Sequence, residues 1–167
     1  MSIKKFGIEK ALEKRLLLRK KQDLHSLKRV ALVVGSHSVD VERLQKKLLS
    51  AFSLSKNQLS SFIYKESKEN EKEKEICFSE KDFNWRGGLK KESRLNDFLA
   101  QDFDLLVNYF SENNLALQLV SASTEAKLKV GVAHEEKRLN DIEIVVKKEE
   151  SGVFISELKK YVDIIKE

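Results

Sequence analysis

Residues 30–34, Val-Ala-Leu-Val-Val, form an uninterrupted apolar run that ends at Gly35. A strand with one face in water alternates apolar and polar residues, whereas a strand buried on both faces is apolar throughout. The run therefore predicts a central strand of a parallel sheet. The segment Asp-Leu-Leu-Val-Asn-Tyr at residues 104–109 has a similar character, and we expect the two strands to be neighbours inside the sheet.

Strands and helices are expected to alternate on both sides of this pair. Apolar residues that recur every three or four positions indicate helices, and short β-branched or aromatic runs indicate strands. Such an alternation predicts an α/β fold, a mostly parallel sheet with helices on both faces. The other expected strands are residues 62–64, 76–78, 128–132 and 142–146, and the expected helices are residues 3–24, 41–52, 93–99, 112–122 (with Ser111 as N-cap) and 154–165.

The N-terminus carries the positive charge of the chain. The 167 residues include 32 Lys and Arg and 27 Asp and Glu, which gives a net charge of +5. Residues 1–29 hold ten of the basic residues and three acidic ones, an asymmetry typical of contact with nucleic acid or another anionic surface. The residues expected to contact a partner are Lys4, Lys5, Lys10, Lys14, Arg15, Arg19, Lys20, Lys21 and, in a separate loop, Trp85.

This charge distribution suggests a division of the chain into two parts. We expect a basic helical arm at residues 1–27 and a single α/β domain at residues 28–167. Within the domain, the Lys/Glu-rich residues 65–75 cannot bury a face and are expected to form a solvated loop.

Two features of this arrangement allow a second interpretation. Ile8, Leu12 and Leu16 recur at helical spacing, so the arm can instead pack on the domain while its lysines face water. Trp85 can anchor a partner, or it can join Phe83 in fixing the loop 79–88 to the edge of the sheet.

The carboxyl ends of the strands are the place where an open α/β sheet binds ligands. Residues 35–38 lie between a strand and a helix, where backbone N–H groups can hold a phosphate. Their single glycine falls short of both the Gly-x-Gly-x-x-Gly fingerprint and a P-loop, so helix capping is the simpler explanation. The candidate ligand-binding residues at this edge are Ser36, His37, Ser38, Asn108 and Tyr109.

The sequence offers no catalytic or metal-binding set. The three histidines, His25, His37 and His134, have no metal-ligand spacing with the single Cys77. A triad built from Ser36, His134 and Asp141 would lack the strained turn that exposes a nucleophile, and Asn140-Asp141 is expected to make a turn. We therefore expect no catalytic residue, no metal and no cofactor.

Four segments carry a resemblance to a known family: FSEKDFNW (78–85), FDLLVNYF (103–110), AKLKVGVA (126–133) and RLNDIEI (138–144), behind the Lys/Arg-rich N-terminal helix. In these segments the chain resembles an uncharacterised bacterial family, a domain of unknown function, over nearly its whole length. The resemblance implies a cytoplasmic Rossmann-like three-layer sandwich and supplies no activity, cofactor or catalytic residue. Residues 103–131 are also similar, more weakly, to the N-terminal half of heptosyltransferase-type glycosyltransferases.

These observations favour a non-enzymatic binding or adaptor domain whose basic arm contacts RNA, a ribonucleoprotein or another acidic partner. The alternative is a small enzyme or sensor that binds a nucleotide or a phosphorylated metabolite at the strand ends. No segment reaches the ~18–20 apolar residues of a membrane span. The apolar run at residues 16–18 is also shorter than the ~7–15 residues of a signal peptide core, so we expect a cytoplasmic protein.

Overall fold

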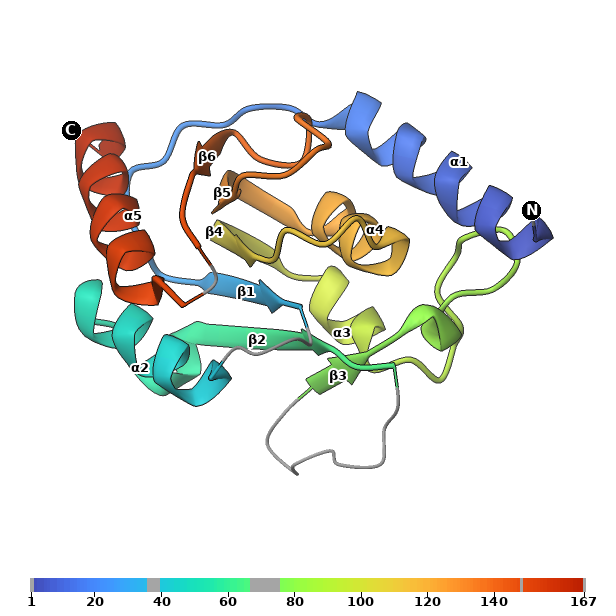
Figure 1. The fold of residues 1–167 in the computed structure, drawn as a ribbon, viewed down its shortest axis with the longest axis horizontal. Coiled ribbons are helices and arrows are strands. Elements are labelled where there is room, and N and C mark those ends of the chain that lie inside the picture. Colours follow the sequence, from blue (N-terminus) through green and yellow to red (C-terminus); the bar gives the residue numbers. More distant parts are fainter. Residues whose placement is uncertain (1, 36–39, 67–75, 148, 167) are drawn as a thin grey trace.

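The computed structural model describes residues 2–35, 40–66, 76–147 and 149–166, which build one six-stranded sheet (Figure 1). Every pairing in this sheet is parallel, and the strand order is β3-β2-β1-β4-β5-β6. The strands at residues 30–34 and 102–109, expected at the centre of the sheet, are neighbours inside it. The strands are β1 (Val30–Val34), β2 (Leu59–Tyr64), β3 (Ile76–Phe78), β4 (Asp102–Tyr109), β5 (Glu125–Val132) and β6 (Ile142–Ile144).

Helices cover both faces of the sheet and complete a Rossmann-like three-layer sandwich (Figure 1). The first face carries α1 (Ile3–Leu18), α3 (Leu95–Leu99) and α4 (Leu115–Ser123), and the second carries α2 (Val41–Ala51) and α5 (Ser151–Lys166). Two short 3-10 turns, Lys56–Gln58 and Glu80–Asp82, lie in the connections. Within the described ranges, no helix is both long and apolar enough to cross a membrane.

Helix α1 is shorter than its sequence pattern predicts. It ends at Leu18 rather than at residue 24, because Arg19 takes an extended conformation (φ −60°, ψ 124°) and directs its guanidinium to Asp141. The chain then runs without regular structure to β1, and Leu24 is buried among the side chains of the opposite face. The connection after α1 therefore passes from one face of the sheet to the other.

Several further boundaries differ from expectation: β2, β5 and α5 each begin three residues earlier than expected, at Leu59, Glu125 and Ser151. Asn114, not Ser111, caps α4, since its side-chain oxygen accepts a hydrogen bond of 3.1 Å from the backbone N–H of Leu117. Strand β6 stops at Ile144, and the next residue, Val145, is 87% exposed. The loop expected at residues 65–75 falls almost entirely outside the described residues.

Candidate functional site

A carboxylate occupies the space above the carboxyl end of β1. A Cβ placed on Gly35 would lie 2.1 Å from Oε2 of Glu112. A negative charge at this position repels a phosphate rather than binding it. Ser36, His37 and Ser38, which the sequence places beside Gly35, lie outside the described residues, so their role stays a prediction.

Asn108 is inside the protein, although the sequence makes it a ligand candidate. Its side chain is 1% exposed and donates hydrogen bonds to Oγ of Ser121 (2.7 Å) and Oδ1 of Asn140 (2.8 Å). Asn140 in turn fills the space above Gly131, where a Cβ would lie 2.7 Å from its amide. Asn108 therefore ties β4 to α4 and to the connection before β6, and Asn140 makes a long-range contact in addition to its turn.

Tyr109 lines a small cavity at the carboxyl edge of the sheet. Its ring meets Phe154 edge-on, with centroids 5.0 Å apart, and burial raises its pKa, to which the charges of Glu149 and Glu150 contribute. The cavity measures about 260 Å³, and the one charged group among its described lining residues is the carboxylate of Glu112. Its chemistry suits an apolar group better than a phosphate. The lining residues are Tyr109, Phe110, Ser111, Glu112, Val132, Ala133, Val145 and Val146.

The N-terminal helix is docked on the domain. Ile8, Leu12 and Leu16 are buried in the core that α4 shares with the sheet, as the second interpretation of the arm expects. At its N-terminal end, α1 also touches the loop after β3. A Cβ on Gly7 would lie 1.9 Å from the carbonyl oxygen of Trp85, so a side chain cannot be accommodated there without movement of the backbone.

Gly87 completes this contact from the loop side. Its φ is +81°, a left-handed conformation that favours glycine. A Cβ on Gly87 would also lie 2.6 Å from the carbonyl oxygen of Gly7. Two glycines, 80 positions apart in the sequence, therefore allow the helix and the loop to meet backbone to backbone.

Two arginines fix α1 by ion pairs. Arg138 forms a bidentate pair with Glu13 of α1 (2.7 and 2.8 Å) and also binds Glu136. These hydrogen bonds lower the pKa of Glu13 and raise that of Arg138. Arg19 binds Asp141 at 2.6 Å and the carbonyl oxygen of Ala126 at 2.8 Å. Its charge is thus neutralised within the protein, and Asp141 takes part in a contact across 122 positions.

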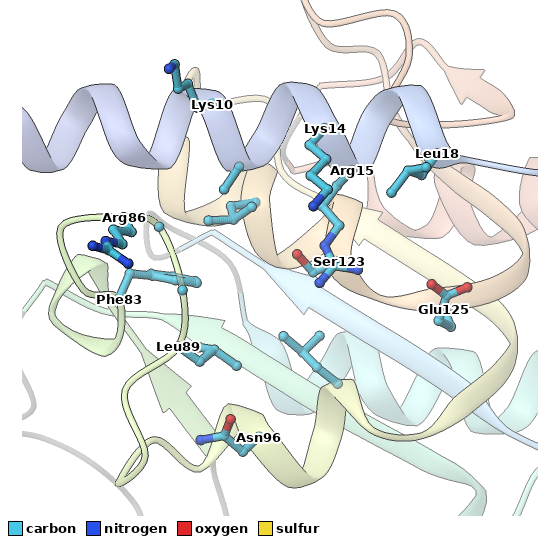
Figure 2. Close-up of a pocket in the computed structure, with 15 residues that line it drawn as sticks. Lys10, Lys14, Arg15, Leu18, Phe83, Arg86, Leu89, Asn96, Ser123 and Glu125 are labelled. Atoms are coloured by element: carbon cyan, nitrogen blue, oxygen red, sulfur yellow. The ribbon is translucent and has the colours of Figure 1, made fainter.

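An open groove of about 820 Å³ lies between α1, the loop after β3 and α3 (Figure 2). Its described lining contains four cationic side chains and one carboxylate, so its charge is strongly positive. The cations are Lys10, Lys14, Arg15 and Arg86, the carboxylate is Glu125, and the other lining residues are Ala11, Leu18, Phe83, Gly87, Gly88, Leu89, Asn96, Leu99, Leu119 and Ser123. We call this feature the basic groove.

The cations come from two sides of the basic groove. Figure 2 shows Lys14 and Arg15 pointing from α1 into the hollow toward Ser123, while Lys10 projects outward at the rim. Arg86 belongs to the loop after β3 on the other side of the groove, and its guanidinium is directed away from Lys14 and Arg15. The acid on this part of α1, Glu13, is held by Arg138 and does not line the groove. Three of the predicted partner contacts, Lys10, Lys14 and Arg15, are therefore brought together with a fourth cation that the sequence analysis missed.

The other predicted contacts lie outside the lining of the basic groove. Lys5, Lys20 and Lys21 are exposed, and Lys4 is partly buried. Trp85 is 57% exposed, whereas Phe83 is buried. The loop after β3 therefore uses Phe83 to attach itself to the core and presents Trp85 to solvent.

A buried lysine lies against the C-terminal end of α4. Lys129 of β5 is 3% exposed, and its Nζ donates to the carbonyl oxygen of Ser121 at 2.9 Å. Burial, with a contribution from the positive charge of Arg19, lowers its pKa to about 8. Since this value is above 7, the ammonium is still charged at neutral pH.

This lysine leads to a pH-dependent prediction. Between about pH 8 and pH 10 the unfolded chain keeps a proton at Lys129 that the folded chain has lost, so folding becomes more favourable as the pH rises. Relative to a Lys129→Met variant, the free energy of unfolding of the unmodified protein should increase by about 2 kcal/mol between pH 7 and pH 9.5. Urea titrations of both proteins at the two pH values measure this difference. A constant difference would contradict the assigned pKa.

No three His, Cys, Asp or Glu side chains of the described residues gather closely enough to hold a metal ion. His134 is buried and uses both ring nitrogens. Nδ1 accepts from the N–H of Glu136 (2.9 Å), so Nε2 carries the hydrogen directed at the carbonyl oxygen of Glu112 (2.9 Å). The carboxylate of Asp141 binds Arg19 and the backbone N–H of Lys129, so it does not orient His134 as a triad would require.

The comparisons with known proteins agree with the resemblance found in the sequence. The model of a family of unknown function (DUF6913) matches residues 4–165. No curated protein and no solved structure matches the chain. The weaker similarity to heptosyltransferase-type glycosyltransferases therefore finds no support.

Proposed function

The chain belongs to DUF6913, a family of unknown function, and we propose from the lining of the basic groove that it is a non-enzymatic domain that binds RNA, free or within a ribonucleoprotein. The observation that carries the proposal is the lining of the groove, four cations around a single carboxylate in about 820 Å³. Neutralisation of phosphates by such cations releases counterions, which is the main source of affinity in sequence-independent binding. We expect this binding to take place in the cytoplasm.

The docking of α1 supports a fixed binding surface. A mobile arm loses conformational entropy when it binds a partner. Lys14 and Arg15 avoid most of this loss, because the helix that carries them is already packed on the core. The ion pair of Glu13 with Arg138 also removes the nearest acid of α1 from competition for these cations. The basic groove is thus preorganised for an anionic chain.

The alternative, a nucleotide or phosphorylated metabolite at the strand ends, has less support. The cavity there is mostly apolar. Among its described lining residues, the one charged side chain is the carboxylate of Glu112. The same acid lies above Gly35, at the point where a phosphate would need backbone N–H groups.

Charge removal from α1 tests the proposal. The variant Lys10→Ala/Lys14→Ala/Arg15→Ala should bind a single-stranded RNA oligonucleotide about 100-fold more weakly at 0.1 M salt. Each phosphate contact contributes about 0.7 to the slope of log affinity against log salt concentration, so the loss of three contacts costs about two powers of ten over the decade below 1 M salt. The slope itself should fall by about 2. Fluorescence anisotropy with labelled RNA at several salt concentrations measures both quantities.

A matched control separates the groove from net charge. The variant Arg43→Ala/Lys46→Ala/Lys160→Ala removes the same charges from exposed sites on α2 and α5, on the other face of the sheet. Its affinity for RNA should change by less than about threefold, since charges on the far side are largely screened. Equal losses in the two variants, or no RNA binding by the unmodified protein, would overturn the proposal.

A further inference from the structure

Two aromatic side chains near the basic groove are exposed to solvent. Trp85 is 57% and Phe6 is 50% exposed. Rings of this size are normally buried, and exposed aromatic residues beside a charged surface are typical of binding sites.

Each of these rings carries a cation that lines the basic groove. The guanidinium of Arg86 lies 4.6 Å from the ring centre of Trp85, and Nζ of Lys10 lies 4.8 Å from that of Phe6. Cation and ring therefore form two pairs at the rim of the basic groove, one on α1 and one on the loop after β3. Such a pair can bind a phosphate and a base of the same nucleotide.

The two pairs lie at the same end of the basic groove. Gly7 follows Phe6 directly in α1 and touches the carbonyl oxygen of Trp85. The backbone next to Phe6 and the backbone of Trp85 are therefore in contact where α1 meets the loop after β3. The deeper cations, Lys14 and Arg15, lie further along α1.

We infer that the basic groove takes single-stranded RNA, with its phosphates along Lys14 and Arg15 and its bases stacked on Trp85 and Phe6. This inference rests on the proposed function and adds the form of the nucleic acid. Bases in a duplex are stacked on one another and do not offer their faces to a protein, whereas an unpaired base does. A groove that served duplex RNA would need the cations alone.

Trp85 is the only tryptophan of the chain and is thus a built-in reporter. In the full-length protein, a single-stranded oligouridylate should quench its fluorescence upon binding, because a base stacks directly on the indole. Inorganic polyphosphate of similar charge should compete for the groove without quenching. A hairpin duplex RNA of the same length should bind at least tenfold more weakly than the single strand.

Variants of the rings complete the test. Trp85→Ala should weaken binding of the single strand about tenfold or more, in line with the measured contribution of one base–aromatic stack. Trp85→Phe should restore most of that loss, and binding of the duplex should not change in either variant. Leu17→Ala removes another exposed apolar side chain of α1 that does not line the groove, and it should have no effect.

The outcomes distinguish this inference from the proposed function. Equal affinity for single strand and duplex, with Trp85→Ala neutral and the α1 charge variant impaired, would overturn the inference and leave RNA binding in place. Binding to vesicles of anionic phospholipid in preference to any RNA would overturn both, since exposed Ile3 and Leu17 on the same helix would then serve a membrane surface.

Discussion

A chain that lacks α1, residues 3–18, is expected not to fold. The deletion uncovers the apolar surface of α4 and removes Ile8, Leu12 and Leu16 from the core. At about 1.5–3 kcal/mol for each buried side chain, the loss is about 5–9 kcal/mol. Since whole domains are stable by about 5–15 kcal/mol, this loss is at least a third of the total and removes all of it from a domain at the lower end of that range.

Circular dichroism and urea titration measure the result of this deletion. The truncated protein should show no cooperative unfolding transition. In contrast, Ile3→Ala and Leu17→Ala in the full chain remove exposed side chains of the same helix and should change stability by less than about 0.5 kcal/mol. A truncated domain that unfolds cooperatively near the melting temperature of the full chain would show that α1 is an independent arm.

A single methyl group at Gly7 should also have a large effect on stability. In an ordinary helix position Gly→Ala stabilises by about 1 kcal/mol. At Gly7 the new Cβ would lie 1.9 Å from the carbonyl oxygen of Trp85, and backbone on both sides has to move. We expect Gly7→Ala to destabilise the protein by about 2 kcal/mol, which lowers Tm by about 4–8 °C.

The same substitution elsewhere is the control. A Cβ on Gly152, in the first turn of α5, would make ordinary contact with Nζ of Lys47 at 3.6 Å. Gly152→Ala should therefore raise stability by about 0.5 kcal/mol. Differential scanning calorimetry of the two variants should give shifts of opposite sign, and a stabilised Gly7→Ala protein would contradict the contact between α1 and the loop.

The sheet could be predicted from the sequence because a run of apolar residues shows by itself which strands are buried on both faces. The continuous apolar run of β1 and the similar run of β4 identify strands with both faces covered, and the alternation with helices fixes the parallel arrangement. Boundaries were less accurate where side chains far away decide them. Arg19 ends α1 because it reaches Asp141, and no local pattern records that partner.

The basic groove could be predicted only in part for the same reason. The lysines and the arginine of α1 were visible as charge, but Arg86 joins them only after the helix has docked on a loop some 70 residues later. A signal for this contact was present in the sequence, namely Gly7 inside a helix and Gly87 beside the only tryptophan. Read alone, Gly7 indicates a weakened helix rather than a close approach.

The docking of α1 on α4 also determines at which stage of protein synthesis the apolar side of α1 becomes buried. Helix α1 is made first, but α4, which covers it, is completed about 100 residues later, or about 5–20 s at ordinary rates of synthesis. During that interval the nascent segment of α1 exposes Ile8, Leu12 and Leu16, because α4 has not yet been synthesised. Lysines placed between them oppose aggregation of such a segment. We therefore expect Lys10 and Lys14 to oppose aggregation of this segment during translation, before the basic groove exists.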